Sequence, residues 1–197
     1  MNLPSILGFM GTLLGLVRAV PQLVRLVRAR QAFGVSVDTT LTSSIVSFGW
    51  AVYGVLTGQV FVTLATGSSG VIFAIVTLLA LRYGRKLREF KIAPLWLAVL
   101  LLAGLVFGKS GLGAALSVST LVSNLPQVRV AYREGNLASL SLGTWLLSLS
   151  DGLVWGIYAL LQGDLSILAY GIFQVSTSAF IVALKWARQA KREALRL

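Results

Sequence analysis

The sequence offers few side chains that could carry out acid–base or metal chemistry. It has no histidine and no cysteine, which removes the commonest general base, the commonest zinc ligands and any disulfide. The acids are scattered, and no two of them form a pair suited to hydrolysis: Asp38, Glu89, Glu134, Asp151, Asp164 and Glu193. We therefore expect a protein that is not an enzyme and that uses no metal and no cofactor.

Asp151 is the one acid well inside a long apolar run, where a charge is costly and is a functional hypothesis by default. It precedes Trp155 by four residues, so the two share a helical face. Arg18 is a candidate charge partner, and Asn124 is a candidate neighbour in the same site. Three interpretations stay open: a carboxylate linked to a proton or cation, a structural pair with Arg18, or an Arg–Asp pair that receives a zwitterionic solute such as an amino acid.

Two Pro-Gln pairs, Pro21-Gln22 and Pro126-Gln127, lie inside apolar runs. A proline inside a helix lacks an N–H and frees the carbonyl four residues earlier, which kinks the helix. The neighbouring glutamine can satisfy the freed backbone groups. A static kink is common in membrane helices. Because the pair occurs twice, we favour the interpretation of two hinges.

The composition predicts that these residues lie in membrane helices. The chain has 197 residues, of which 56% are hydrophobic and 12% charged, and its mean hydropathy is +0.85. A soluble domain carries about twice that charged fraction. A helix needs roughly 20 apolar residues to cross a bilayer. Apolar runs and turn signals predict seven such helices, at 3–27, 36–56, 60–82, 92–107, 111–132, 140–161 and 165–186.

The distribution of lysine and arginine predicts the orientation. The net charge is +11, and the positive residues cluster after the first, third, fifth and seventh helices, whereas the opposite loops hold only Lys109. The positive-inside rule then places the N-terminus outside and the C-terminus in the cytoplasm. We expect the protein to lie in the cytoplasmic membrane of a cell. Short clusters between apolar runs give no stripe for nucleic acid, so we expect no nucleic-acid partner.

An internal repeat organises the helices. Aligning Pro21 with Pro126 sets an offset of 105 residues (126 minus 21), and without gaps this also pairs Trp50 with Trp155 and Tyr53 with Tyr158. Three helices per repeat require one further crossing to keep both repeats parallel. The expected domains are a first repeat at 1–84, a basic loop and linker helix at 85–109, a second repeat at 110–187 and a basic tail at 188–197.

These motifs resemble a known family. Pro-Gln near the end of the first helix of each repeat, then Val-Ser-Val or Leu-Ser-Leu, then Trp-x-x-Tyr-Gly or Trp-x-x-Tyr-Ala, are similar to PQ-loop proteins, and among them to the SWEET and SemiSWEET sugar transporters. The resemblance covers nearly the whole chain apart from the linker helix and the tails. It implies an all-α membrane protein of seven transmembrane helices, arranged as two parallel three-helix bundles (3+1+3).

The resemblance also implies a binding site near the midplane between the repeats. The residue at the position of Trp155 supplies an aromatic platform for the solute, and Trp50 is its repeat counterpart. The family's asparagine, sixteen residues after each tryptophan, is replaced here by Thr66 and Gly171. Gln174, one helical turn further on, is a candidate substitute.

We therefore predict a SWEET-like transporter that moves a small polar solute, a sugar in the first instance, by alternating access through a central cavity. The alternatives are a proton-coupled, amino-acid-type PQ-loop transporter that uses Asp151, and a non-transporting seven-helix receptor. The expected partners are a small-molecule solute and the lipid bilayer. One chain already holds both repeats, so a monomer is sufficient for a complete path.

Overall fold

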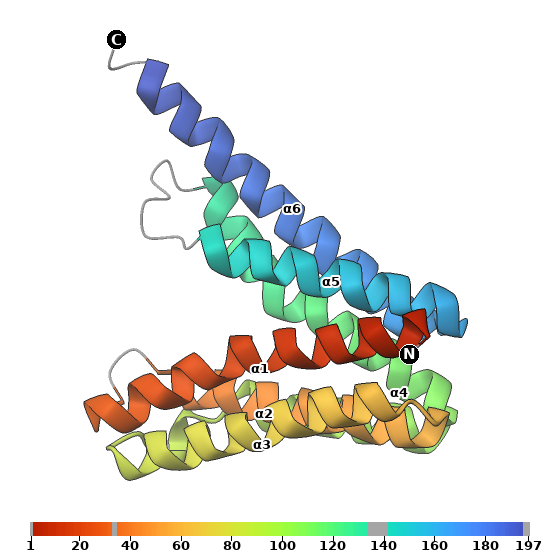
Figure 1. Ribbon diagram of the computed structural model, residues 1–197. Helices are drawn as coiled ribbons and strands as arrows, with labels where there is room; N and C mark the ends of the chain where they lie inside the picture. The colour runs from red at the N-terminus through yellow and green to blue at the C-terminus, as the bar shows by residue number, and fades with distance from the viewer. Residues whose placement is uncertain (1, 33–34, 134–141, 195–197) are drawn as a thin grey trace. The chain divides into compact units, whose positions relative to one another are not determined.

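The computed structural model describes residues 2–32, 35–133 and 142–194, without the side chains of 126, 127, 130 and 189–194. Figure 1 shows that the described residues form helices and no strand. The α-helices are α1 (Leu3–Ala29), α2 (Val37–Thr57), α3 (Val60–Arg82), α4 (Ile92–Arg133), α5 (Leu142–Gln162) and α6 (Leu165–Ala194), with a short 3₁₀ helix, η1, at Leu87–Glu89.

The helix α4 contains two of the seven predicted membrane helices. Its backbone leaves helical geometry at Gly108, where φ is 62° and ψ is −150°, a conformation that glycine tolerates because it has no Cβ. The segments on either side of Gly108 match the predicted helices 92–107 and 111–132, so the 3+1+3 order is confirmed. The predicted start of the sixth helix, residues 140 and 141, lies outside the described residues.

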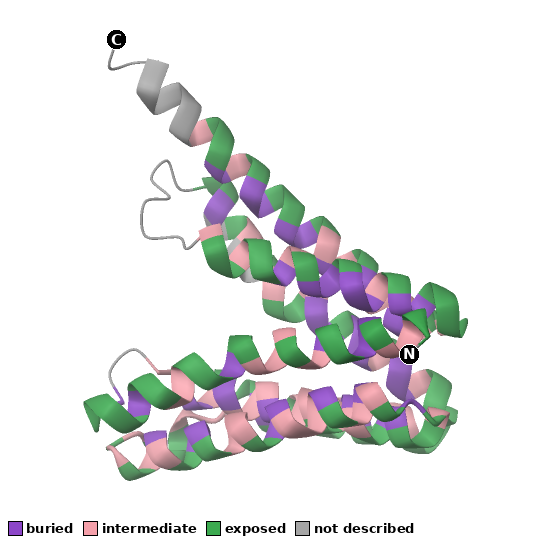
Figure 2. Cartoon of the chain, in the orientation of Figure 1, coloured by how far each residue is buried: buried purple, intermediate pink, exposed green. Residues whose placement is uncertain are grey.

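The helices have the length and composition of membrane spans. In the described part of the chain, six helices are long and apolar enough to cross a bilayer, and one of these, α4, holds two helical segments that meet at the non-helical residue Gly108. Large apolar side chains cover their outer faces, as on α4, where Leu105 is 82% exposed. Figure 2 shows these exposed faces in green. Such surfaces suit lipid, and the chain is a multi-pass membrane protein.

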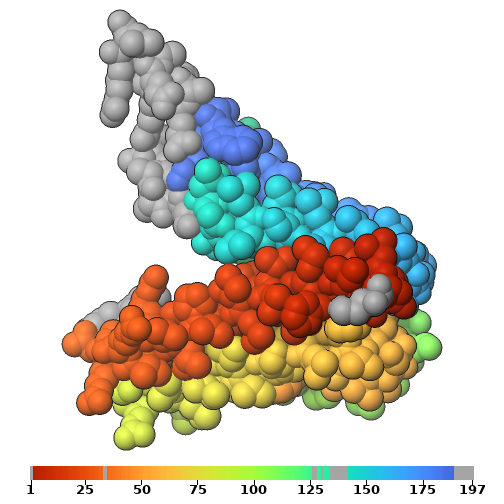
Figure 3. Space-filling model, viewed as in Figure 1, coloured from red at the N-terminus to blue at the C-terminus, as the bar shows by residue number. Residues whose placement is uncertain are grey.

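The chain divides into two compact units, Met1–Leu116 and Ser117–Leu197. The first unit holds α1 to α3 together with α4 as far as Leu116, which includes the linker part before Gly108. Within it, α3 packs against both α1 and α2, and Figure 3 shows α1 and α3 side by side along their length. Phe61 of α3 seats directly against Gly8 of α1, where a Cβ would lie 2.4 Å from the ring. Small residues therefore set the close approach of these helices.

The turns between the second and third helices of the two repeats have the same geometry. Gly58 follows α2 with φ 72°, and Gly163 follows α5 with φ 68°. Both glycines stand in the left-handed region that closes a helix, and the next helix begins two residues later. The predicted turns at these two positions are confirmed, and they are equivalent positions in the alignment of the two repeats.

Asp38 ties the linker part of α4 to the first repeat. Its carboxylate, in the first turn of α2, accepts hydrogen bonds from the backbone N–H groups of Lys91, Ile92 and Ala93 at 2.9–3.1 Å. These are donors that the start of a helix leaves without partners. Nearby, Arg85 donates to the carbonyl of Val35 at 2.8 Å. The basic loop is thus anchored to the start of α2.

Candidate functional site

The two tryptophans that the repeat predicts as site residues make the same kind of aromatic contact in each repeat. Trp50 packs edge-to-face against Tyr53, with ring centroids 5.5 Å apart and an interplanar angle of 86°. Trp155 packs against Tyr158 at 5.3 Å and 82°. Both tryptophans are 7% exposed. An edge-to-face pair restricts the rotation of each ring, so both indoles are held in one orientation near the middle of their helices.

The two positions at which the sequence resemblance predicts an asparagine, Thr66 and Gly171, have different surroundings. Thr66 is half-buried, and its hydroxyl donates to the carbonyl of Val62 in its own helix at 2.6 Å. Gly171 is buried where α5 and α6 almost touch: a Cβ at this position would lie 2.7 Å from Cα of Gly156 and 2.9 Å from the carbonyl oxygen of Gly152. A side chain at 171 would collide with backbone. Gly171 can contribute to a site only through its own backbone.

Asp151 lies inside the second unit. It is 2% exposed, and the hydroxyl of Tyr170 on α6 donates to its Oδ2 at 2.5 Å. Gly152, the next residue, packs against the Cβ of Gln174. The hydrogen bond between Asp151 and Tyr170 therefore connects α5 and α6 beside their close glycine contact. It lies on the side of α5 that also carries Trp155. Asp151 and Trp155 do share a buried face, as their spacing predicts.

A chain of polar side chains continues from this pair along α6. Asn124, on the second part of α4, donates through Nδ2 to Gln174 Oε1 at 3.1 Å and to Thr177 Oγ1 at 2.8 Å. Gln174 in turn donates through Nε2 to Ser178 Oγ at 3.3 Å. Gln174, Thr177 and Ser178 are all buried. The structure thus connects two predicted site residues, Asn124 and Gln174, by a direct hydrogen bond.

The predicted hinges lie within continuous helices. Pro21 stands inside α1, which runs on for two more turns to Ala29. Pro126 stands inside α4, and the side chains of Pro126 and Gln127 lie outside the described residues. Arg18, one turn before Pro21, is exposed on α1 of the first unit, whereas Asp151 belongs to the second unit. The hinge roles and the Arg18–Asp151 pair stay predictions.

Sequence reasoning missed three members of the polar chain: Tyr170, Thr177 and Ser178. A signal for them existed. Together with Gln174 they occupy positions i, i+4, i+7 and i+8 of one apolar helix, which is the spacing of a single helical face. A polar stripe of this kind inside a membrane helix indicates a face turned toward protein or water instead of lipid.

Comparison with known proteins supports the fold. A comparison with protein-family models and a search of curated proteins found no match. Among solved structures, the chain is similar to a eukaryotic SWEET transporter, with a TM-score of 0.73 and 19% sequence identity. The similarity covers 96% of this chain and all of the other. The chain therefore has the SWEET fold, as the sequence motifs predicted.

Proposed function

We propose that this protein is a SWEET-like membrane transporter that moves a small polar solute, a sugar, by alternating access. The observation that carries the proposal is the SWEET fold over 96% of the chain. The duplicated Trp–Tyr pairs add to it, since in each repeat an indole packs edge-to-face against a tyrosine of the same helix. No step of the proposed function makes or breaks a covalent bond in the solute.

The tryptophans suit a sugar as the solute. The C–H faces of a pyranose ring are apolar and stack on an aromatic ring, while its rim of hydroxyls needs hydrogen-bond partners. In this proposal Trp50 and Trp155 supply the platforms. The polar residues of the second repeat supply the hydrogen bonds, since Gly171 has no side chain and the hydroxyl of Thr66 is bonded to its own helix.

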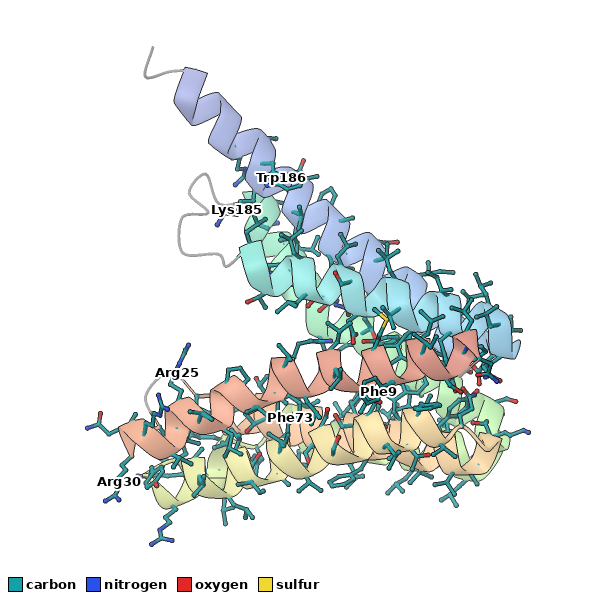
Figure 4. All side chains as sticks on the ribbon, viewed as in Figure 1. Phe9, Arg25, Arg30, Phe73, Lys185 and Trp186 are labelled. Carbon is teal, nitrogen blue, oxygen red and sulfur yellow. The ribbon has the colours of Figure 1, made fainter. Side chains whose placement is uncertain are left out.

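The proposed location is the cytoplasmic membrane of a cell, with the N-terminus outside. The described basic residues support this orientation. Arg25 and Arg30 extend from the C-terminal end of α1 in Figure 4, and the loop after α3 carries Arg85 and Lys86. Both positions are cytoplasmic in the proposed topology, as the positive-inside rule requires. Labelling of single cysteines added at Asn2 and Lys86 with a membrane-impermeant reagent tests it: only the first should react in intact cells.

A second candidate function, proton-coupled transport of an amino acid, is favoured by one observation. A carboxylate buried in a membrane bundle is costly to keep charged, and Asp151 is 2% exposed with a tyrosine hydroxyl on its Oδ2. Its repeat counterpart is Val46, so the fold does not require an acid there. Such a residue can exchange a proton during transport.

Uptake into reconstituted vesicles tests both candidates. Purified protein in liposomes is given radiolabelled glucose, sucrose or glycine, with and without an inward pH gradient. The proposal predicts that a sugar equilibrates down its own gradient and that Trp155→Ala abolishes this flux. Glycine accumulation that requires the pH gradient and Asp151 would favour the second candidate. Saturable binding without flux would contradict both and favour a receptor.

A further inference from the structure

The hydrogen bonds around Asn124 fix which way its amide points. The hydroxyl of Thr177 donates to the carbonyl of Phe173 at 2.7 Å, so its one proton is used within α6. The oxygen of this hydroxyl can then only accept, and its partner in α4 must be a donor. Asn124 therefore presents its NH2 group to Thr177 at 2.8 Å and to Gln174 at 3.1 Å. Its carbonyl oxygen, Oδ1, takes no part in these two bonds to α6.

The oxygen Oδ1 of Asn124 is the member of this network that stays available. Within the described part of the chain, no donor forms a hydrogen bond to this oxygen. Asn124 is half-buried, and its Oδ1 is not among the fully buried polar atoms that lack a hydrogen-bond partner. Exposing an amide oxygen to lipid without a hydrogen-bond donor costs several kcal/mol of free energy, because no water is present in the hydrocarbon to replace the missing donor. An open amide oxygen in a membrane helix is accordingly expected to face a water-filled path.

The first repeat shows that the fold does not need this network. At the offset of 105 residues, Asn124, Gln174, Thr177 and Ser178 correspond to four residues that include no amide: Ala19, Ser69, Ile72 and Phe73. The helices of the first repeat pack without it. Hydrogen bonds between membrane helices contribute only about 0.6 kcal/mol each on average. Packing alone is therefore a weak reason for two residues, Gln174 and Thr177, to accept hydrogen bonds from one amide.

We propose that Asn124 determines solute specificity in the second repeat by accepting a hydrogen bond from a solute hydroxyl through Oδ1. Gln174 and Thr177 are positioning residues that hold the amide so that an acceptor, never the NH2 group, faces the solute. The class of ligand is therefore a polyhydroxyl solute read at one of its O–H groups. This inference rests on the proposed function and names the residue that would replace the family's missing asparagine.

The proposed role of Asn124 is tested by comparing how wild type and a variant bind glucose and its analogues that each lack one hydroxyl. Equilibrium binding of D-glucose and of its monodeoxy analogues is measured on the purified full-length protein and on Asn124→Leu. Wild type should bind one deoxy analogue about tenfold more weakly than glucose, the loss expected when one hydrogen bond goes unmade. Asn124→Leu should bind glucose and that same analogue equally. An Asn124→Leu protein that keeps the full discrimination, or that weakens every sugar by one common factor, overturns the proposal.

Thr177→Val provides a variant that leaves Asn124 in place. It removes the acceptor that orients the amide, so discrimination against the same analogue should fall about threefold, and Thr177→Ser should restore it. Ile72→Val, the matched change in the first repeat, should leave discrimination unchanged. Equal effects of Thr177→Val and Ile72→Val would overturn the positioning role.

Binding and flux separate this inference from the proposed function. Discrimination that depends on Asn124 in a protein that moves no sugar into vesicles would uphold the inference and refute transport. Sugar flux whose selectivity ignores Asn124 would uphold transport and refute the inference. Wild-type protein that binds none of the glucose probes but binds glycine overturns the assignment of a polyhydroxyl solute.

Discussion

The interiors of the two repeats are built from different side chains on one scaffold. In the first repeat, buried hydroxyls join α2 and α3: Thr77 donates to Thr40 at 2.9 Å, and Ser44 donates to the carbonyl of Gly70 at 2.9 Å. In the second repeat a carboxylate and two amides replace apolar or hydroxyl residues, beginning with Asp151 on Tyr170. The Trp–Tyr pairs and the glycine turns are the same in both.

This difference separates what the fold requires from what it merely permits. Features kept twice, such as the turns at Gly58 and Gly163, are required to bring three helices together. Features found once, such as Asp151 where the first repeat has Val46, are permitted by the fold and need another reason. Polar groups in a membrane are costly. Solute recognition is therefore expected to lie mainly in the second repeat.

The largest expected effect comes from placing an asparagine at Gly171, compared with the same change at its repeat counterpart Thr66. Gly171→Asn should destabilise the protein by about 3 kcal/mol, because its Cβ would meet the backbone of Gly156 and Gly152. Thr66→Asn, the matched change in the first repeat, should change stability by about 0.5 kcal/mol at most. Thermal unfolding in detergent measures both. Equal stability of the two variants would show that α5 and α6 separate easily at Gly171.

The next effect comes from giving the second repeat the residues of the first. Asp151→Val combined with Tyr170→Ala transplants Val46 and Ala65. If the acid–tyrosine pair serves function, uptake should fall about tenfold, equivalent to about 1.4 kcal/mol. The thermal midpoint should stay within a few degrees of the wild-type value. A large fall in the midpoint with normal uptake per folded protein would identify the pair as structural.

A smaller effect is expected at Asp38, which has no acidic counterpart because Gly143 stands at that position of the second repeat. Asp38→Ala removes the acceptor for three backbone N–H groups at the start of α4 and should cost about 1 kcal/mol of stability. Hydrogen exchange should rise at residues 91–93 and not at the start of α5. Unchanged exchange there would mean that water replaces the carboxylate without loss.

The smallest expected effect concerns the paired prolines. Pro21→Ala and Pro126→Ala should each leave the protein folded and slow uptake by about threefold, since each removes one of two proposed hinges. The comparison between them is the informative part: similar slowing indicates that the repeats move alike. Unchanged uptake in both variants would refute the hinges and leave two static kinks.

Much of the fold could be predicted from the sequence because the bilayer restricts the possibilities. The helix Val60–Arg82 begins and ends at the predicted residues, since apolar length and the polar residues that interrupt it mark a membrane span directly. The break between the predicted helices 92–107 and 111–132 is confirmed at Gly108, whose positive φ glycine adopts readily.

Less of the candidate site could be predicted, because it depends on which helix faces meet. Asp151 and Tyr170 are 19 residues apart and belong to different helices. Spacing alone gives the face of each helix but not the partner across the gap. For the same reason, the sequence shows only that Gly171 stands where the resemblance predicts an asparagine. The structure shows that this glycine lets the backbones of α5 and α6 pack closely.

The sequence by itself determined that this is a membrane protein of seven helices in two repeats, because hydropathy, charge and the 105-residue offset are properties of the chain and need no contacts. Only the tertiary structure decided what the repeats contain: the Trp–Tyr geometry, the close crossing at Gly171 and the lock on the Asn124 amide. Each of these is set by the distance and rotation of one packed helix against another, which side-chain packing fixes only once the helices meet.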